Sequence, residues 1–126
     1  MKVRTDYTCP LEIVHDFIKG KWKTIILFQL RNGECSLSDL QHSIEGISQK
    51  MLLEQLKELE AFGLVTKKKY DGYPLKVGYL LTEDRGQYML KAIRIMQNIG
   101  IDYMIEHGME AELNKKGICI ISKENW

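Results

Sequence analysis

Apolar and polar residues alternate with helical spacing through the first part of the chain. Apolar positions every three or four residues predict a helix over about 10–19, opened by Pro10 and ended by Gly20. A second helix is expected over about 21–31, before a glycine cap. We expect this second helix to bury Trp22, Ile25, Ile26 and Leu30.

Two more helices follow, joined by a glycine turn. Ser36 and Asp39 have the spacing of a capping box, which predicts a short third helix. Gly46 supplies the turn, and Ser48 is a good cap for a fourth helix over about 48–62. Its leucines repeat at helical spacing and should form the buried face: Leu52, Leu56 and Leu59. Two short helices joined by a glycine turn are typical of a helix-turn-helix.

A β-hairpin is predicted after the fourth helix. "LVTKKKY" has strand character, "DGYPLK" is a turn, and "VGYLLT" is the return strand, which together give a wing over about 64–82. Thr82 is expected to cap a long last helix that ends near His107. The order of elements predicts a mainly α protein with a small β-hairpin (α+β), a winged helix-turn-helix. We expect one domain over 1–126, with a tail over 108–126 to which the pattern assigns no role.

Composition agrees with a globular chain. Its 126 residues suffice for one ordinary domain, and 44% are hydrophobic against 28% charged. The apolar runs are shorter than the roughly 20 residues that cross a bilayer, and the N-terminus does not resemble a signal peptide. We therefore expect a cytoplasmic protein without membrane contact. Three cysteines without paired spacing argue against a disulfide framework.

No catalytic or metal-binding pattern is present in the sequence. The three histidines are far apart and lack ligand spacing, and the carboxylates are scattered over helix faces. There is no phosphate-binding glycine loop and no nucleophile elbow. We expect no enzyme activity, no metal and no cofactor.

The fourth helix and the wing differ in charge. Residues 47–62 hold two lysines against three glutamates, net −1, whereas residues 63–79 hold four lysines against one aspartate, net +3. The helix face opposite the leucines could enter a DNA major groove, where glutamine suits adenine and lysine suits guanine. The alternative is a solvated helix face. The candidate DNA-binding residues of this helix are Ser48, Gln49, Lys50, Leu53 and Lys57.

The wing carries the remaining candidates, Lys67, Lys68, Lys69 and Lys76. Strand alternation places residues 67 and 69 on one face and 68 on the other, so the three neighbours cannot all reach the same phosphate. The alternative is that these lysines protect an edge strand against pairing with another sheet.

The whole pattern resembles the HxlR-type winged-helix transcription regulators. The resemblance covers about residues 8–104 and is carried by "CPLEIVHDFIKGKWKTIILFQLRNG", "SLSDLQHSIEGISQKMLLEQLKELEAFGLV" and "VGYLLTEDRGQ". It implies a homodimer joined through its first and last helices, with the fourth helix and the wing on double-stranded operator DNA. The chain departs from the family at Gln49, where proline is common, and at Gly78, where glutamate is common. It also departs where the family often has polar or basic residues, at Leu53, Glu54 and Gln55.

Cys9 is the candidate sensor. It lies directly before the proline that opens a helix, where the helix dipole and free amides stabilise a thiolate. Several regulators that resemble this one sense oxidants or electrophiles through a cysteine at this place. The alternative is a small residue packed at the dimer seam. Cys35 and Cys119 are expected to be inert.

The long last helix has two apolar stripes, where a surface helix needs one. Met89, Ile93 and Met96 form the first; Tyr88, Ala92, Ile95 and Ile99 form the second. The wider apolar surface favours burial against a partner subunit as well as the helix's own domain. The leading hypothesis is a dimeric DNA-binding regulator whose effector the sequence does not indicate. The alternative is a winged helix that binds another protein and not DNA.

Overall fold

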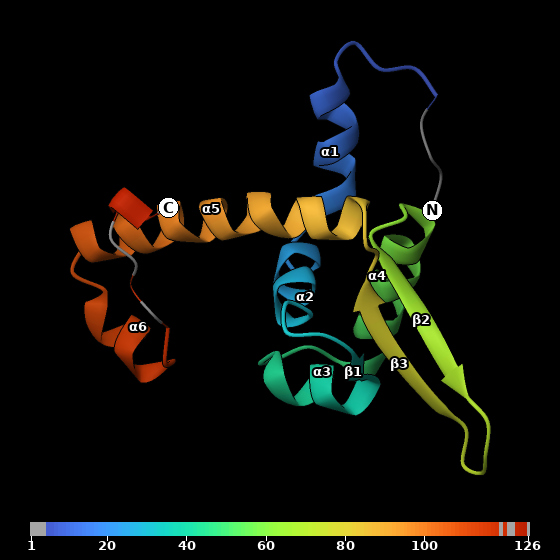
Figure 1. Cartoon of the computed structure of the whole chain (residues 1–126). Coiled ribbons are helices and arrows are strands. Elements are labelled where there is room, and N and C mark those ends of the chain that lie inside the picture. The colour runs from blue at the N-terminus through green and yellow to red at the C-terminus, as the bar shows by residue number, and fades with distance from the viewer. Residues whose placement is uncertain (1–4, 119, 121–122, 126) are drawn as a thin grey trace. The chain divides into compact units, whose positions relative to one another are not determined.

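The computed structural model describes residues 5–118, 120 and 123–125 (Figure 1). The chain forms two compact units, one up to Leu90 and one from Lys91 onward. The helices and strands follow in this order: α1 (Pro10–Ile18), α2 (Lys23–Gln29), β1 (Cys35–Ser36), α3 (Leu37–Ser43), α4 (Gln49–Ala61), β2 (Val65–Tyr70), β3 (Lys76–Leu81), α5 (Arg85–Glu106), α6 (Glu110–Lys115) and the 3-10 helix η1 (Lys123–Asn125). The order of α1 to α4, the β2–β3 hairpin and α5 is the predicted winged helix-turn-helix order, whereas β1, α6 and η1 are additional elements.

Side-chain caps fix the starts of the two helices of the helix-turn-helix. At α3 the Ser36 hydroxyl accepts a bond of 3.0 Å from the Asp39 amide, and the Asp39 carboxylate accepts one of 3.2 Å from the Ser36 amide. At α4 the Ser48 hydroxyl accepts from the Met51 amide at 3.1 Å. Gly46 in the turn has φ +85°, a conformation that favours glycine. Both predicted caps are confirmed.

The buried face of α2 agrees only in part with the one expected. Ile26 and Leu30 are buried as predicted, but Ile25 is exposed and Trp22 is only half-buried. Leu27 and the charged Lys23 take their places in the core. The apolar run in this helix covers nearly its whole circumference, so periodicity alone did not decide which side faces the core.

Three antiparallel strands form the sheet, in the order β1-β3-β2. In the β2–β3 hairpin, Lys67 lies opposite Tyr79 and Lys69 lies opposite Val77. Strand β1 adds a short pairing in which Cys35 lies opposite Tyr79. Figure 1 shows the turn of the hairpin projecting away from α3 and α4. The hairpin is therefore anchored at its base and free at its tip.

A hydrogen-bonded junction connects the end of α4 to the start of α5. The Thr82 hydroxyl donates to the Gly63 carbonyl at 2.8 Å and accepts from the Gly86 amide at 2.7 Å. The Arg85 guanidinium donates to the Phe62 carbonyl at 2.7 Å. Helix α5 begins at Arg85, three residues after the expected cap, because residues 83 and 84 form a turn.

The second unit contains the rest of α5, then α6 and η1. Helix α5 ends at Glu106, close to the expected end, and Gly108 follows with φ +74°. In the tail, Leu113 of α6 is almost completely buried. Cys119 lies outside the described residues. Within the described ranges, no helix combines the length and apolar character needed to cross a membrane.

Candidate nucleic-acid interface

Helix α4 presents one buried and one exposed face. Leu52, Leu56 and Leu59 are buried, as expected. The five candidate residues of this helix segment are all exposed, including Leu53 at 42%: Ser48, Gln49, Lys50, Leu53 and Lys57. The structure thus brings these side chains to a surface that a partner can reach.

The charge of this exposed face differs from that of the whole helix. Of the three glutamates, only Glu54 is fully exposed; Glu58 and Glu60 are half-buried. The Glu58 carboxylate forms an ion pair with Lys23 of α2 at 2.5 Å. Two exposed lysines of α4 therefore stand against one exposed glutamate, which gives the outward face a net charge of +1. The acidic balance seen in the sequence does not describe the surface.

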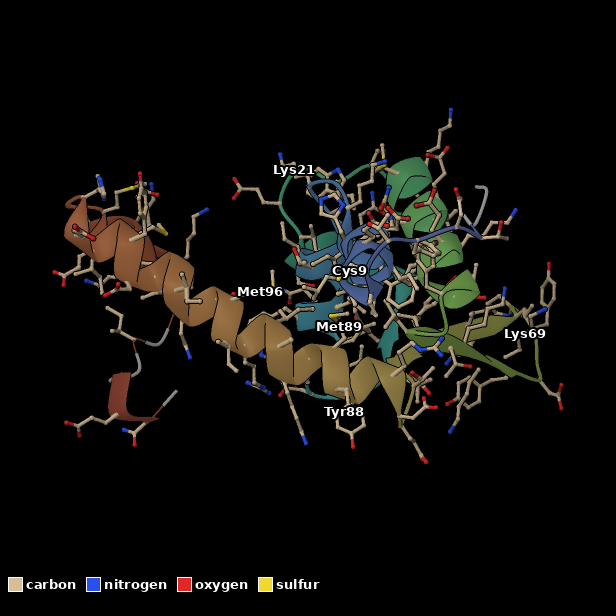
Figure 2. All side chains as sticks on the ribbon, turned by 90° about the horizontal axis from the view of Figure 1, so that it is seen from above. Cys9, Lys21, Lys69, Tyr88, Met89 and Met96 are labelled. Atoms are coloured by element: carbon tan, nitrogen blue, oxygen red, sulfur yellow. The ribbon has the colours of Figure 1, made fainter. Side chains whose placement is uncertain are left out.

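The four lysines of the hairpin are all exposed. Because residues directly opposite each other share a face of the sheet, Lys67 and Lys69 lie on the face that carries the buried Tyr79. Lys68, opposite Gly78, lies on the other face together with Lys76, which is opposite Tyr70. The alternation expected within the lysine run is confirmed. Figure 2 shows Lys69 on the hairpin, away from the helices.

The Glu34 carboxylate lies across the face of the hairpin that carries Lys68 and Lys76. Tyr70 donates its hydroxyl hydrogen to the Glu34 carboxylate, with both oxygens at 2.8 Å. Glu34 can reach across β3 because Gly78 has no side chain: a Cβ there would overlap the Glu34 carboxyl. This hydrogen bond raises the pKa of the Tyr70 phenol. The face with Lys68 and Lys76 therefore also carries a negative charge.

Three of these residues were missed in the sequence: Lys23, Glu34 and Tyr70. Their partners lie 32 to 36 positions away along the chain, at Gln55 for Lys23 and at Tyr70 for Glu34. The one available signal was the glycine at position 78, since glycine inside a strand often marks the close approach of another group.

The two described cysteines have different surroundings. Cys9 is the exposed N-cap residue of α1, directly before Pro10 (Figure 2). Cys35 is half-buried, and its thiol donates weakly to the carbonyls of Gln29 and Gly33 at 3.8 and 3.7 Å. Burial, with the nearby Asp39 carboxylate, raises the pKa of the Cys35 thiol. Cys9 is therefore the more accessible of the two thiols.

Two helices expose apolar side chains. All nine residues of α1 are at least partly exposed, and Leu11 is 73% exposed. In the second unit, Ile95, Ile99 and Tyr103 of α5 follow one another at intervals of four and are all exposed.

In the described part of the chain, no group of three or more histidine, cysteine or carboxylate side chains could hold a metal ion.

Comparison with known proteins agrees with the winged helix-turn-helix. A sequence profile of the HxlR-like helix-turn-helix family matches residues 17–108. The HTH-type transcriptional regulator YkvN of Bacillus subtilis is 46% identical over 77 residues, which are 61% of this chain. That match spans 65% of YkvN, slightly less than two thirds of its length.

Solved structures of known regulators have the same fold as this chain. The redox regulator HypR in its reduced form superposes with a TM-score of 0.71 at 35% identity, covering 75% of this chain and 92% of HypR. The reduced transcriptional regulator YodB from B. subtilis has a TM-score of 0.64 at 34% identity, covering 72% of this chain and 89% of YodB. These relatives are regulators of transcription and not enzymes. With the profile spanning α2 through α5, the chain belongs to the HxlR-like helix-turn-helix family of transcriptional regulators.

Proposed function

We propose that this protein is a homodimeric regulator that binds double-stranded operator DNA. Helix α4 enters the major groove with Ser48, Gln49, Lys50 and Leu53 toward the bases, and Lys57 lies near the backbone. The hairpin lysines contact phosphates. The proposal treats 1–126 as one functional domain and keeps the cytoplasmic location expected from the sequence.

The observation that carries the proposal is the exposed face of α4. Its buried leucines hold the helix on the domain, while a polar and net positive face points away from them. The hairpin next in the chain adds four exposed lysines. Two surfaces of this kind fit a polyanion with readable base edges better than they fit an apolar protein groove.

Dimerisation is supported by the exposed apolar residues of α1 and α5. Leu11, Ile95, Ile99 and Tyr103 expose large apolar areas that a second copy of the chain would cover. In a two-fold dimer, two recognition helices about 34 Å apart match half-sites one turn of DNA apart.

Control by oxidants or electrophiles through Cys9 is part of the proposal. The thiol is exposed at the start of α1, one of the two helices proposed to join the subunits. Two structural relatives, HypR and YodB, have been determined in more than one redox state, and HypR is described as a redox regulator. Oxidation at Cys9 would change the dimer and, through it, the spacing of the two α4 helices.

Binding to the promoter beside the protein's own gene tests the proposal. Fluorescence anisotropy across a series of salt concentrations should give a slope of log affinity against log salt near −5, if about six phosphates are neutralised per dimer. A flat salt response, or no binding at micromolar protein, would refute DNA binding and favour the alternative of a protein-interaction module.

A further inference from the structure

The first residue of α2, Lys23, has a buried side chain that reaches the middle of α4. Lys23 is only 5% exposed, although lysine is rarely buried without a partner. Its ammonium donates to Gln55 Oε1 at 2.8 Å and forms the ion pair with Glu58 Oε2 at 2.5 Å. Both partners belong to α4, so one charge on α2 holds the helix that carries the candidate base-reading residues.

The two contacts fix more than one degree of freedom. Gln55 and Glu58 are three positions apart, so their side chains lie about one turn apart on the same side of α4. An ammonium bonded to both resists rotation of α4 about its axis and sliding along it. The neighbouring leucines Leu52, Leu56 and Leu59 hold α4 by close packing in the same core, and the ammonium adds contacts that depend on direction as well as distance.

The pair joins a buried ammonium to a half-buried carboxylate, and an ion pair of this kind is a weak source of stability. Removing two charges from water costs much of what their attraction returns, and apolar residues of similar volume often serve the fold equally well. Fixing the geometry of neighbouring elements is the other role that such pairs are known to serve.

We infer that Lys23, with Gln55 and Glu58, is a positioning residue that sets the orientation of α4 and so the discrimination between DNA sequences. This inference rests on the proposed DNA binding. Gln49 and Lys50 lie one to two turns before Gln55 on the same helix, and a small rotation at the ion pair moves their side chains relative to the base edges.

The test measures discrimination between DNA sequences separately from the stability of the fold and from the net charge of the protein. The variant Lys23→Met/Glu58→Leu removes the pair and leaves the net charge unchanged. Its matched control is Lys21→Met/Glu45→Leu, which removes one lysine and one glutamate at exposed positions; Lys21 is labelled in Figure 2. The probes are a duplex of about 30 base pairs that the parent protein selects from a randomised pool, long enough for two half-sites, and a scrambled duplex of equal length.

We expect the core variant to melt within a few degrees of the parent and to bind the scrambled duplex with the same affinity and salt slope. Its preference for the selected duplex should fall by about tenfold or more, as expected when at least one base contact is misplaced. The surface control should keep the parent's preference.

The two possible failures have different signatures. If the parent selects no sequence, or binds both duplexes equally, the proposed function itself is refuted, and the role in discrimination with it. If the parent discriminates and the core variant discriminates equally well, only the positioning role of Lys23 is overturned. A loss of discrimination of the same size in the surface control also overturns it.

Discussion

The two faces of the hairpin should contribute unequally to DNA affinity. Lys67 and Lys69 share a face on which both charges are positive, whereas Lys68 and Lys76 share a face crossed by the Glu34 carboxylate. Toward its tip, the first face carries the two positive charges of Lys67 and Lys69, and Glu60 acts on Tyr79 nearer its base. On the second face Glu34 offsets one of the two positive charges between Lys68 and Lys76, which leaves +1. We therefore expect Lys67→Ala/Lys69→Ala to weaken binding more than Lys68→Ala/Lys76→Ala does.

The size of the effect follows from counterion release. If each of the two lysines neutralises one phosphate in each subunit, the first variant loses four contacts per dimer, and the salt slope becomes shallower by about 3.6. At 0.15 M salt this corresponds to an affinity loss of about 10³-fold, the same for all sequences. With half the local charge, the second variant should lose about half of that slope.

Anisotropy titrations of both variants on one duplex, at four or more salt concentrations, measure these slopes. Each variant removes two lysines from the same hairpin, so each is the control for the other. An unequal contribution of the two faces is refuted if the Lys68/Lys76 variant loses as much salt slope as the Lys67/Lys69 variant, or more. An effect confined to one DNA sequence would contradict a phosphate role for either face.

Three other predictions concern the sensor, the wing and the dimer. Diamide should change DNA binding of the parent and of Cys35→Ser but leave Cys9→Ser unaffected; equal responses in all three would exclude Cys9 as the sensor. Glu34→Gln should lower the pKa of Tyr70 in an NMR titration, because the acceptor that raises it loses its charge. The pKa of Tyr70 is higher in the folded than in the unfolded protein, so its protonated phenol stabilises the folded state at pH values below the unfolded pKa. That contribution to the free energy of unfolding is lost as the pH rises through the folded pKa. Ile99→Glu should weaken the dimer by at least about 100-fold in sedimentation equilibrium, because burying an unpaired carboxylate costs several kcal/mol; an unchanged dimer would place the interface elsewhere.

Features encoded within a few residues were predicted well. The caps at Ser36 and Ser48 depend on donors three residues away, and strand alternation in the lysine run depends only on the two-residue period of a β-strand. The buried leucines of α4 were found because a polar majority surrounds them, so the helix has one apolar side. Local chemistry decides each of these features.

The face of α2 was predicted correctly at Ile26 and Leu30 but wrongly at Ile25, for the opposite reason. Its sequence KTIILFQ is apolar on several sides, so the buried set depends on which other elements pack against it. Exposed Ile25 and buried Lys23 become intelligible only once Gln55 and Glu58 lie beside the ammonium. The same holds for Thr82, whose hydroxyl bonds to Gly63 and Gly86 while the helix begins later, at Arg85.

The sequence by itself determined the order of the helices α1 to α5 and the hairpin, the winged helix-turn-helix that they form, and the concentration of lysine in the wing. Only the tertiary structure decided the electrostatics of the candidate DNA-binding surface. In the folded chain Glu58 pairs with Lys23 of α2, away from the outward face of α4. Glu34 lies across Gly78 on one face of the hairpin, where it accepts a hydrogen bond from Tyr70. The physical reason is that the effect of a charge depends on its burial and its partners, and residues more than thirty positions apart supply both.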